Sequence, residues 1–404
     1  MNASFVNEPG RARIALAAGA LVFGLSLGVR LSMALFIGPI NTQTGLGLAQ
    51  VSLAFAVGQL MWGLAQPIGG ALADRFGSAR VIAAGAAMIA AGTLLTPLAT
   101  DLLTLVLAVG VLAAGGAGFA GPSVVMAAVN RIVPPAQRGM ASGIVNAGGS
   151  LGQFIIAPLA GYLLVHAGWS LALAALAVVS LLAVPMAMPL RGRAAASAGP
   201  EQSLGQAVRA ALADPSFGLL NLGFFVCGFH VAFIATHLPG VIAACGLPPT
   251  VGAWSLAVIG LFNIAGSFTV GWAVGRWRMK SLLSIIYASR ALIIVAFLAA
   301  PKTAPTFIVF AAAIGFTYLS TVPPTAGLVA KLHGPRYMAT LFGLVMLSHQ
   351  VGGFLGAWLG GRAFERDGSY DWMWYADIAL AVGAALVHLP IREARPARPA
   401  LGAA

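Results

Sequence analysis

Charged side chains are scarce in this chain. Of its 404 residues only 8% are Asp, Glu, Lys or Arg, whereas 59% are hydrophobic. Soluble domains carry roughly a quarter charged residues. A surface with so little charge cannot face water over most of its area, so the composition excludes a soluble globular protein and predicts an integral membrane protein with many spans in a lipid bilayer.

Cysteines and nucleotide-binding patterns are also scarce or missing. The two cysteines, Cys227 and Cys245, stand alone without CxxC spacing, which argues against a disulfide framework and a zinc site. No Walker loop occurs, so ATP is not expected to drive the protein directly. Because the sequence has no appended domain, recognisable nucleophile or metal site, we expect no enzyme activity, no metal and no cofactor. The first apolar segment is too long for a signal peptide and is expected to remain as the first span.

Apolar segments are abundant, and a helix needs about 20 such residues to cross a bilayer. Charged, Pro-rich and Gly- or Asn-rich stretches divide the sequence into twelve candidate spans: 13–40, 50–72, 79–98, 103–130, 139–166, 169–190, 216–242, 251–274, 281–300, 306–330, 338–363 and 372–390. A polar stretch separates the sixth from the seventh. We therefore predict an all-α fold with a six-helix bundle over 1–190, a linker over 191–215 and a second six-helix bundle over 216–404.

The basic residues are distributed asymmetrically around these spans. The net charge is +12, but Lys and Arg recur in small groups between apolar segments and form no single stripe, which argues against nucleic-acid binding. Seventeen of the 22 lie at the termini or in the loops on their side, three lie in the opposite loops, and Arg30 and Arg290 fall inside spans. Cytoplasmic loops are enriched in Lys and Arg, so this bias predicts cytoplasmic termini and an even number of spans.

Short motifs recur in the two halves at nearly one offset. RGMAS, from Arg138, opens the fifth span, and RYMAT, from Arg336, opens the eleventh span 198 residues later. The loop containing Arg75 is likewise echoed by the loop containing Arg276, 201 residues later. These echoes predict two pseudo-symmetric bundles. Parallel repeats of this kind place a substrate site near the bilayer midplane, between the halves.

The loop GALADRFGSAR, between the second and third spans, resembles the signature loop of the major facilitator superfamily. The matching positions are Gly70, Leu72, Asp74, Arg75, Gly77 and Arg80, and all but Leu72 are expected to act in conformational gating. With the twelve spans and the half-chain echo, the resemblance covers nearly the whole chain and implies the major facilitator fold. In that family the loop Asp bonds a helix N-terminus or a cation of the opposite half. The alternative is a tight solvated turn.

A finer resemblance concerns the first span, GLSLGVRLSMALFIGPI. It is similar to the monocarboxylate-porter and oxalate/formate-exchanger branch, in which a basic residue lies at or within a residue of Arg30, and SHQVGGFLGAWLGG, from Ser348, resembles bacterial members. Asn263 and Ser267 stand roughly where those carriers have an Asp and Arg pair, which leaves the proton carrier open. We expect a monomeric, multi-pass protein of the plasma membrane, here the bacterial inner membrane.

Arg30 is the strongest candidate for a binding residue. It lies 17 residues after Arg13, about 25 Å along a helix, in a span that continues to about Ile40. Among the ten acidic residues only Asp377 lies inside a span, and near its end, so Arg30 has no obvious counter-ion. Because an unpaired buried charge is expensive, we expect the missing negative charge to be the ligand's. A guanidinium fork suits a carboxylate. Structural pairing or snorkelling is the alternative.

Other polar residues within spans are weaker candidates. Beside Arg30 we predict six substrate-binding residues: Asn146, His230, Asn263, Tyr318, His349 and Gln350. Histidine can bond a carboxylate and titrate near neutral pH, so His230 or His349 could carry a proton; His237 is a weaker candidate. An interhelical hydrogen bond is the alternative for each. Arg290 is expected to bond backbone carbonyls or Tyr287, and whether it lines the cavity stays open.

The functional prediction is a secondary active transporter of a small organic anion, in particular a monocarboxylate. It would work by alternating access, as a proton symporter or an anion exchanger. The alternative is an efflux carrier for amphipathic or cationic compounds. Such a carrier generally places a carboxylate in its cavity, and the sequence offers none.

Overall fold

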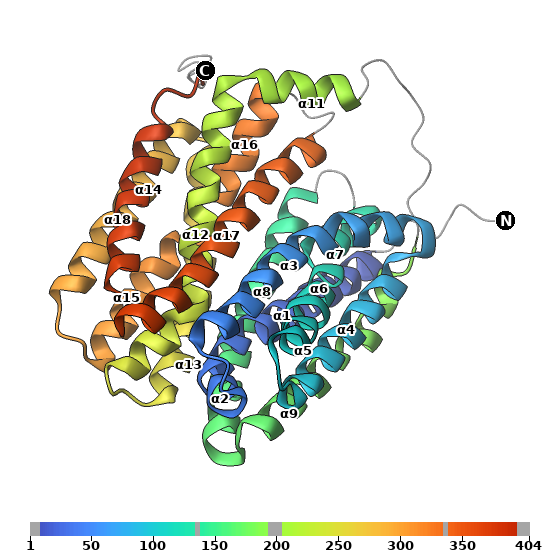
Figure 1. Ribbon diagram of the computed structural model, residues 1–404. Coiled ribbons are helices and arrows are strands. Elements are labelled where there is room, and N and C mark those ends of the chain that lie inside the picture. Colours follow the sequence, from blue (N-terminus) through green and yellow to red (C-terminus); the bar gives the residue numbers. More distant parts are fainter. Residues whose placement is uncertain (1–8, 134–137, 193–203, 334–337, 394–404) are drawn as a thin grey trace, which may run out of the picture.

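The computed structural model describes residues 9–133, 138–192, 204–333 and 338–393 (Figure 1). This part of the chain is helical and contains no strand. The elements of the first half are α1 (Pro9–Ser32), the 3₁₀ segment η2 (Met33–Phe36), α2 (Ile37–Thr44), α3 (Leu48–Phe76), α4 (Ser78–Leu95), η3 (Thr96–Leu98), α5 (Leu102–Leu105), the π-helical segment η4 (Val106–Ala114), α6 (Gly115–Phe119), α7 (Pro122–Ile132), α8 (Arg138–Ala167), α9 (Trp169–Leu181), α10 (Ala183–Met186) and η6 (Met188–Leu190). The second half comprises α11 (Leu204–Ala213), α12 (Pro215–Ala244), α13 (Pro249–Val274), α14 (Met279–Ala299), α15 (Ala304–Thr317), α16 (Val322–His333), α17 (Met338–Asp367) and α18 (Asp371–Val387).

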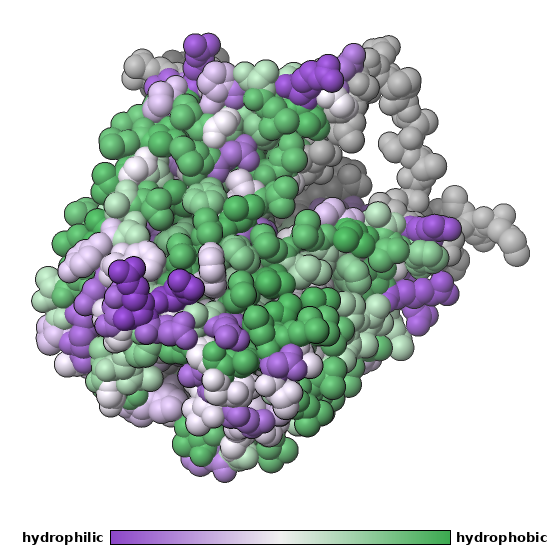
Figure 2. Space-filling model, in the orientation of Figure 1, coloured by the Kyte–Doolittle hydropathy of each residue, from purple (hydrophilic) through white to green (hydrophobic). Residues whose placement is uncertain are grey.

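The molecule has the surface of a multi-pass membrane protein. In the described chain, eleven helical segments are long and apolar enough to cross a membrane by length and composition. The twelfth expected span corresponds to α18, whose 17 residues are one short of the 18 that define the other eleven. Apolar side chains cover much of the visible surface, and polar side chains gather mainly toward its two ends (Figure 2). Large apolar residues such as Leu292 and Val309 are 70% and 68% exposed.

The two halves of the chain repeat one arrangement. The helices α3, α4, α8 and α9 have counterparts in α13, α14, α17 and α18, each of which begins 200–202 residues later. Within the first half α1 packs most extensively on α8, and within the second half α12 packs on α17. The halves lie side by side (Figure 1) and contact each other mainly through α3 with α17 and α8 with α13.

Small residues allow the closest of these helix contacts. Gly148 and Gly152 of α8 lie directly against the backbone of Ala20 and Gly24 in α1, which leaves no room for a side chain. The corresponding helix of the second half, α17, approaches α12 in the same way through Gly352. The small-residue stripe in the fifth span therefore serves close helix packing, as such stripes do in other membrane proteins.

The halves meet at the end of the molecule away from the termini and separate toward the termini. Gly361, late in α17, lies against Ser52, early in α3, and Gln350 packs on Gly63 in the middle of the contact. One further step of seven residues along the same helix face leads to Gly70 on α3 and to Gly343 on α17. Among the described residues, no atom lies within 4 Å of a Cβ placed at either glycine.

Three local features differ from the sequence prediction. The first span is not one helix, because the 3₁₀ segment Met33–Phe36 interrupts it; Pro39 lacks the N–H that would bond the carbonyl of Leu35. The fourth span contains the π-helix Val106–Ala114 and breaks before Pro122. The linker expected over 191–215 contains α11, whose apolar residues recur at helical spacing, so that composition alone concealed a helix.

Candidate functional site

Arg30 lies in the last turn of α1, just before the 3₁₀ segment, and its side chain is partly exposed. Its terminal nitrogen donates a hydrogen bond of 2.5 Å to the Gln59 side-chain oxygen on α3. The central carbon of its guanidinium lies 4.5 Å from the ring centroid of Trp62, one turn further along α3. Both partners are uncharged. Among the described residues, no carboxylate forms an ion pair with Arg30.

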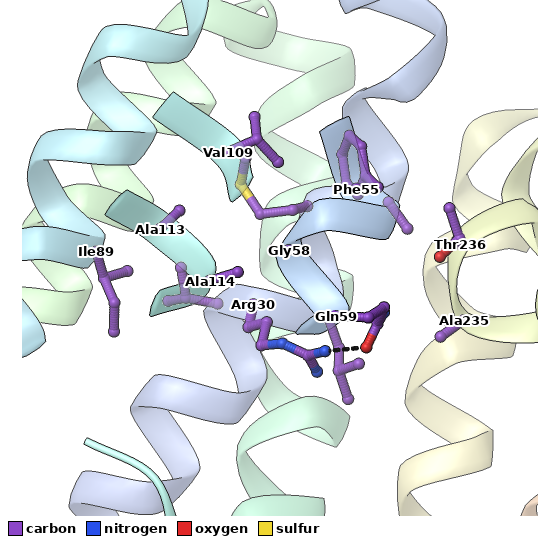
Figure 3. Close-up of a pocket in the computed structure, with 14 residues that line it drawn as sticks. Arg30, Phe55, Gly58, Gln59, Ile89, Val109, Ala113, Ala114, Ala235 and Thr236 are labelled. Carbon is purple, nitrogen blue, oxygen red and sulfur yellow. Dashed lines mark hydrogen bonds between the residues drawn. The ribbon is translucent and has the colours of Figure 1, made fainter. Parts of the chain in front are cut away.

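The Arg30 side chain borders a cavity between the halves. About 510 Å³ of empty space, which includes part of the open solvent, is lined by residues of α1, η2, α3, α4, η4 and α12. Figure 3 shows the guanidinium directed toward Gln59, with Thr236 on the facing helix α12. The lining is otherwise apolar, with Phe55 and Val109 among its members. A single cation in a small, largely apolar cavity is a setting in which its electrostatic attraction for an anion is weakly screened.

Tyr318 follows the end of α15 and is 4% exposed. Its hydroxyl donates a 2.9 Å hydrogen bond to the carbonyl of Val231. It lies within electrostatic range of the Arg30 guanidinium, which belongs to the other half. The structure thus brings these two predicted ligands to the same region.

Gln350 and His349 occupy the middle of α17. Gln350 is 1% exposed and lies against Gly63, one turn from Gln59 along α3. Its side-chain nitrogen has no hydrogen-bond partner among the described residues. His349 is 7% exposed and packs its ring on Phe224, with 4.9 Å between ring centroids. Gln350 therefore packs on α3 one turn from Gln59, the partner of Arg30, whereas His349 faces the interior of the second half.

Asn263 joins the two bundles. Its side-chain nitrogen donates to the Ser150 hydroxyl on α8 over 2.9 Å, and its oxygen accepts from the backbone N–H of Leu319 at 3.0 Å. Both ends of the amide are therefore used by the protein itself. Asn146, one turn before Ser150, is half-buried on α8.

His230 lies at the midpoint of α12 but does not line the cavity around Arg30. Its ring nitrogen Nε2 lies 3.0 Å from the backbone carbonyl of Asp377 on α18 and 3.4 Å from that residue's carboxylate oxygen. His237, two turns further along α12, contacts the carbonyl of Ala357 at 2.6 Å. Both histidines therefore bond neighbouring helices of their own half.

Arg290 is 1% exposed inside the second half. It donates to the carbonyls of Thr317 and, over 2.6 Å, Tyr318, where the tenth span breaks between α15 and α16. Its guanidinium also lies 5.2 Å from the ring centroid of Tyr287. As expected, this arginine holds backbone carbonyls.

The predicted gating loop lies at the end where the halves separate. Gly77 joins α3 to α4 with a φ of +94°, a conformation that favours glycine. Arg75 and Arg80 are exposed, and Arg75 lies over the ring of Phe76. Asp74 is part of α3, but its side chain lies outside the described residues.

Sequence reasoning missed the immediate partners of Arg30. Gln59 and Trp62 are neighbours of the cation in the structure, and Thr236 completes the polar lining from the other half. Gln59 is a lone amide inside the apolar run AVGQLMWG, which is a signal of the same kind as Arg30 itself. Trp62 carries no such signal, because aromatic residues are common throughout membrane spans.

Two bundles of membrane-crossing helices, with the Arg30 guanidinium at a cavity between them, are typical of two-domain membrane transporters. The family model described as Major Facilitator Superfamily matches residues 16–357 and also 221–402. The chain therefore belongs to this superfamily. It is a multi-pass membrane transporter and not an enzyme.

Named relatives indicate which branch of the superfamily this chain resembles. The chain is 28% identical over 365 residues to monocarboxylate transporter 13 of Rattus norvegicus, covering 87% of this chain and 81% of the relative. It is 25% identical over 350 residues to the oxalate:formate antiporter of Oxalobacter formigenes, covering 82% and 80%. The inward open conformation of the xylose transporter XylE from E. coli has the same fold, with a TM-score of 0.71, 13% identity and 96% of each chain covered. The resemblance to the monocarboxylate-porter and oxalate/formate branch is confirmed.

Proposed function

We propose that this protein is a secondary active transporter of small monocarboxylates, with Arg30 as the anion-binding residue. The observation that supports this most directly is the environment of Arg30. Its partners are the neutral side chains of Gln59 and Trp62, and it borders a cavity between the halves. A carboxylate entering that cavity would supply the negative charge that the protein does not.

The energetics allow a ligand role for Arg30, because its partners in the protein do not neutralise its charge. A cation in the middle of a membrane span costs about 2.5–3.5 kcal/mol on insertion scales. The charge-assisted hydrogen bond to Gln59, worth about 1.5–3 kcal/mol, and one cation–π contact of about 0.5–2 kcal/mol are of the same size as that cost, but both partners are neutral. A bound carboxylate would add the missing counter-charge and would accept two parallel hydrogen bonds from the guanidinium fork.

The remaining ligands would come from both halves. From the second half, Tyr318 lies within electrostatic range of Arg30, Thr236 lines the same cavity, and Gln350 packs on α3 one turn from Gln59. We assign Asn263 to the contact between the bundles instead, because Ser150 and Leu319 already use its amide. Two other predicted ligands, His230 and His349, contact Asp377 and Phe224 of the second half. We therefore do not assign them to the anion site.

Transport would follow from rocking the halves about this site. The bundles are in contact at the end away from the termini and apart at the end bearing them, which suits a cavity that opens toward the termini. In this proposal the two bundles, over 1–190 and 216–404, move as units within a monomer. The loop from Gly70 to Arg80 gates that motion, with Asp74 as its acidic latch.

The bias of Lys and Arg toward the termini supports cytoplasmic termini in a bacterial inner membrane. Cation efflux, the alternative function, is less well supported. Among the described residues, no carboxylate lines the cavity around Arg30.

Uptake into proteoliposomes tests the proposal. Labelled formate, acetate, lactate, pyruvate and oxalate would be offered to the wild type, Arg30→Ala and Arg30→Lys. Truncating one partner of a buried charged pair costs about 2–5 kcal/mol, so Arg30→Ala should weaken anion affinity by at least about 30-fold. Arg30→Lys, which keeps the charge but not the planar fork, should fall in between.

The control is Arg366→Ala, which removes an arginine whose side chain is 86% exposed at the far end of α17. It should transport like the wild type. Equal affinity for the anion in Arg30→Ala and the wild type, in folded protein, would remove Arg30 from the binding site. Uptake of cations in place of carboxylates by the wild type would overturn the proposed substrate class.

A further inference from the structure

A second polar site lies inside the second half, away from the Arg30 cavity. It consists of Asp377 on α18 and His230 on α12, whose side chains are 0% and 2% exposed. His230 is at the midpoint of a 30-residue helix, so the pair lies deep within the membrane span. Carboxylates at such depth are rare and generally serve ion or proton pathways.

The carboxylate of Asp377 is underbonded. Among the described residues, neither of its oxygens receives a hydrogen bond. The Nε2 atom of His230 is 3.4 Å from one of them, but its hydrogen bond goes to the backbone carbonyl of Asp377 at 3.0 Å. An ionised carboxylate without donors in an apolar interior is expensive, and the group takes up a proton instead. The pair therefore holds at least one proton in this conformation.

The titratable groups around Asp377 set its charge balance. From α12 come His230 and, one turn before it, Cys227; from α14 comes Arg290, which acts on Asp377 by electrostatic attraction without touching it. Tyr287 of α14 donates its hydroxyl to the carbonyl of Gly223. The histidine of α17, His349, faces Phe224 and Cys227. Among the described residues, no second carboxylate acts electrostatically on Asp377.

Hydrogen bonds and electrostatic interactions connect this pair to the anion site. Arg290 bonds the backbone carbonyl of Tyr318, and the Tyr318 hydroxyl bonds the carbonyl of Val231, the residue after His230. The same tyrosine lies within electrostatic range of Arg30. A change of charge on the pair can therefore act on the cavity electrostatically, through Arg290 and Tyr318.

We propose that the His230–Asp377 pair is the binding site of the coupling proton, which rests on the proposed function as a monocarboxylate transporter. The proton enters from the aqueous phase on one side and leaves to the other, so one proton crosses with one carboxylate. When both the carboxylate and the proton are bound, the anion neutralises Arg30 and the proton neutralises Asp377. The loaded protein then reorients with Arg30 and Asp377 both neutralised, while Arg290 keeps its hydrogen bonds to backbone carbonyls.

Infrared difference spectroscopy tests the proton site without any substrate. A pH change applied to the reconstituted wild type should alter the C=O stretching band of a protonated carboxyl group, and Asp377→Asn should lose that band. Asp371→Asn, which removes the exposed first residue of α18, should keep it. His230→Gln should move the pH at which the band changes. Persistence of the full band in Asp377→Asn overturns the proposal.

Transport driven by a pH gradient tests the coupling. With one proton per carboxylate, a gradient of about one pH unit supports about tenfold accumulation of labelled lactate, because each factor of ten corresponds to about 1.4 kcal/mol. Asp377→Asn should lose this accumulation but still exchange labelled for unlabelled lactate at a measurable rate, and Asp371→Asn should keep both. Wild-type accumulation in Asp377→Asn overturns the proposal. If the wild type transports no carboxylate but shows the Asp377 band, the proposed function fails and the proton site stands.

Discussion

Adding a single methyl group to Gly361 should force the two bundles apart at the end away from the termini. Gly361 of α17 lies against Ser52 and Leu48 of α3, and a Cβ at this position would lie 2.6 Å from the backbone oxygen of Leu48. Overpacking of this kind costs about 1–3 kcal/mol. Since the contact joins the halves only while this end is closed, Gly361→Ala should disfavour the conformation described here by about 5–150-fold.

Distances between spin labels at the opposite end report that equilibrium. Ala71 on α3 and Thr269 on α13 are exposed and lie toward the end bearing the termini, so their separation should shorten when that end closes. In Gly361→Ala the population of the long distance should fall and that of a shorter distance should rise. Gly343→Ala, on the same helix but without neighbours within 4 Å among the described residues, is the matched control and should resemble the wild type.

Two results would refute this reasoning. The first is an unchanged distance distribution in Gly361→Ala, which would mean that the contact between α3 and α17 does not distinguish the two states. The second is an equal shift in Gly343→Ala, which would point to a general loss of helix packing. Ser52→Gly in the Gly361→Ala background should recover part of the wild-type distribution, because it removes the Ser52 side chain that the new methyl group would contact.

Two further outcomes follow from hydrogen bonds. Asn263→Ala should lower the melting temperature in detergent more than Ser150→Ala, because it leaves the Leu319 N–H unpaired at about 1–3 kcal/mol; equal effects would show that the backbone bond adds nothing. Asp101 caps α5 by accepting the Thr104 N–H, a bond that lowers the pKa of its carboxyl group. The cap therefore stabilises α5 above pH about 4 and weakens as the pH falls through that lowered pKa. Asp101→Asn should melt below the wild type at neutral pH and approach it in acid, and a difference that grows in acid would contradict this.

The sequence predicted the architecture because membrane burial leaves strong marks on composition. The twelve apolar runs, the half-chain echo and the loop from Gly70 to Arg80 all point to one fold, and the family match confirms it. The local winding was harder to predict. The 3₁₀ segment before Pro39 depends on a single missing hydrogen bond, and α11 depends on the spacing of a few apolar residues. Hydrophobicity averaged over about 20 residues detects neither of them.

The sequence predicted the charged residue of the site, Arg30, but not the orientation of the neutral polar residues. Arg30 is conspicuous because its charge is costly in an apolar run, and the structure puts it beside a cavity. The direction of His230 depends instead on the packing of α12 against α18, which no local pattern encodes. Asp377 was placed near the end of a span, and only the packed structure brings it to the middle of α12.

The 3₁₀ segment that follows Arg30 gives the first span an adjustable pitch. A 3₁₀ helix turns about 120° and rises about 2.0 Å per residue, against about 100° and 1.5 Å in an α-helix. Rewinding the four residues Met33–Phe36 would therefore rotate α2 by about 80° relative to Arg30 and draw it about 2 Å closer. Because close contacts hold α1 on α8, such a change of winding would move α2 and the cavity wall at Met33 and Ala34 while Arg30 stays in place.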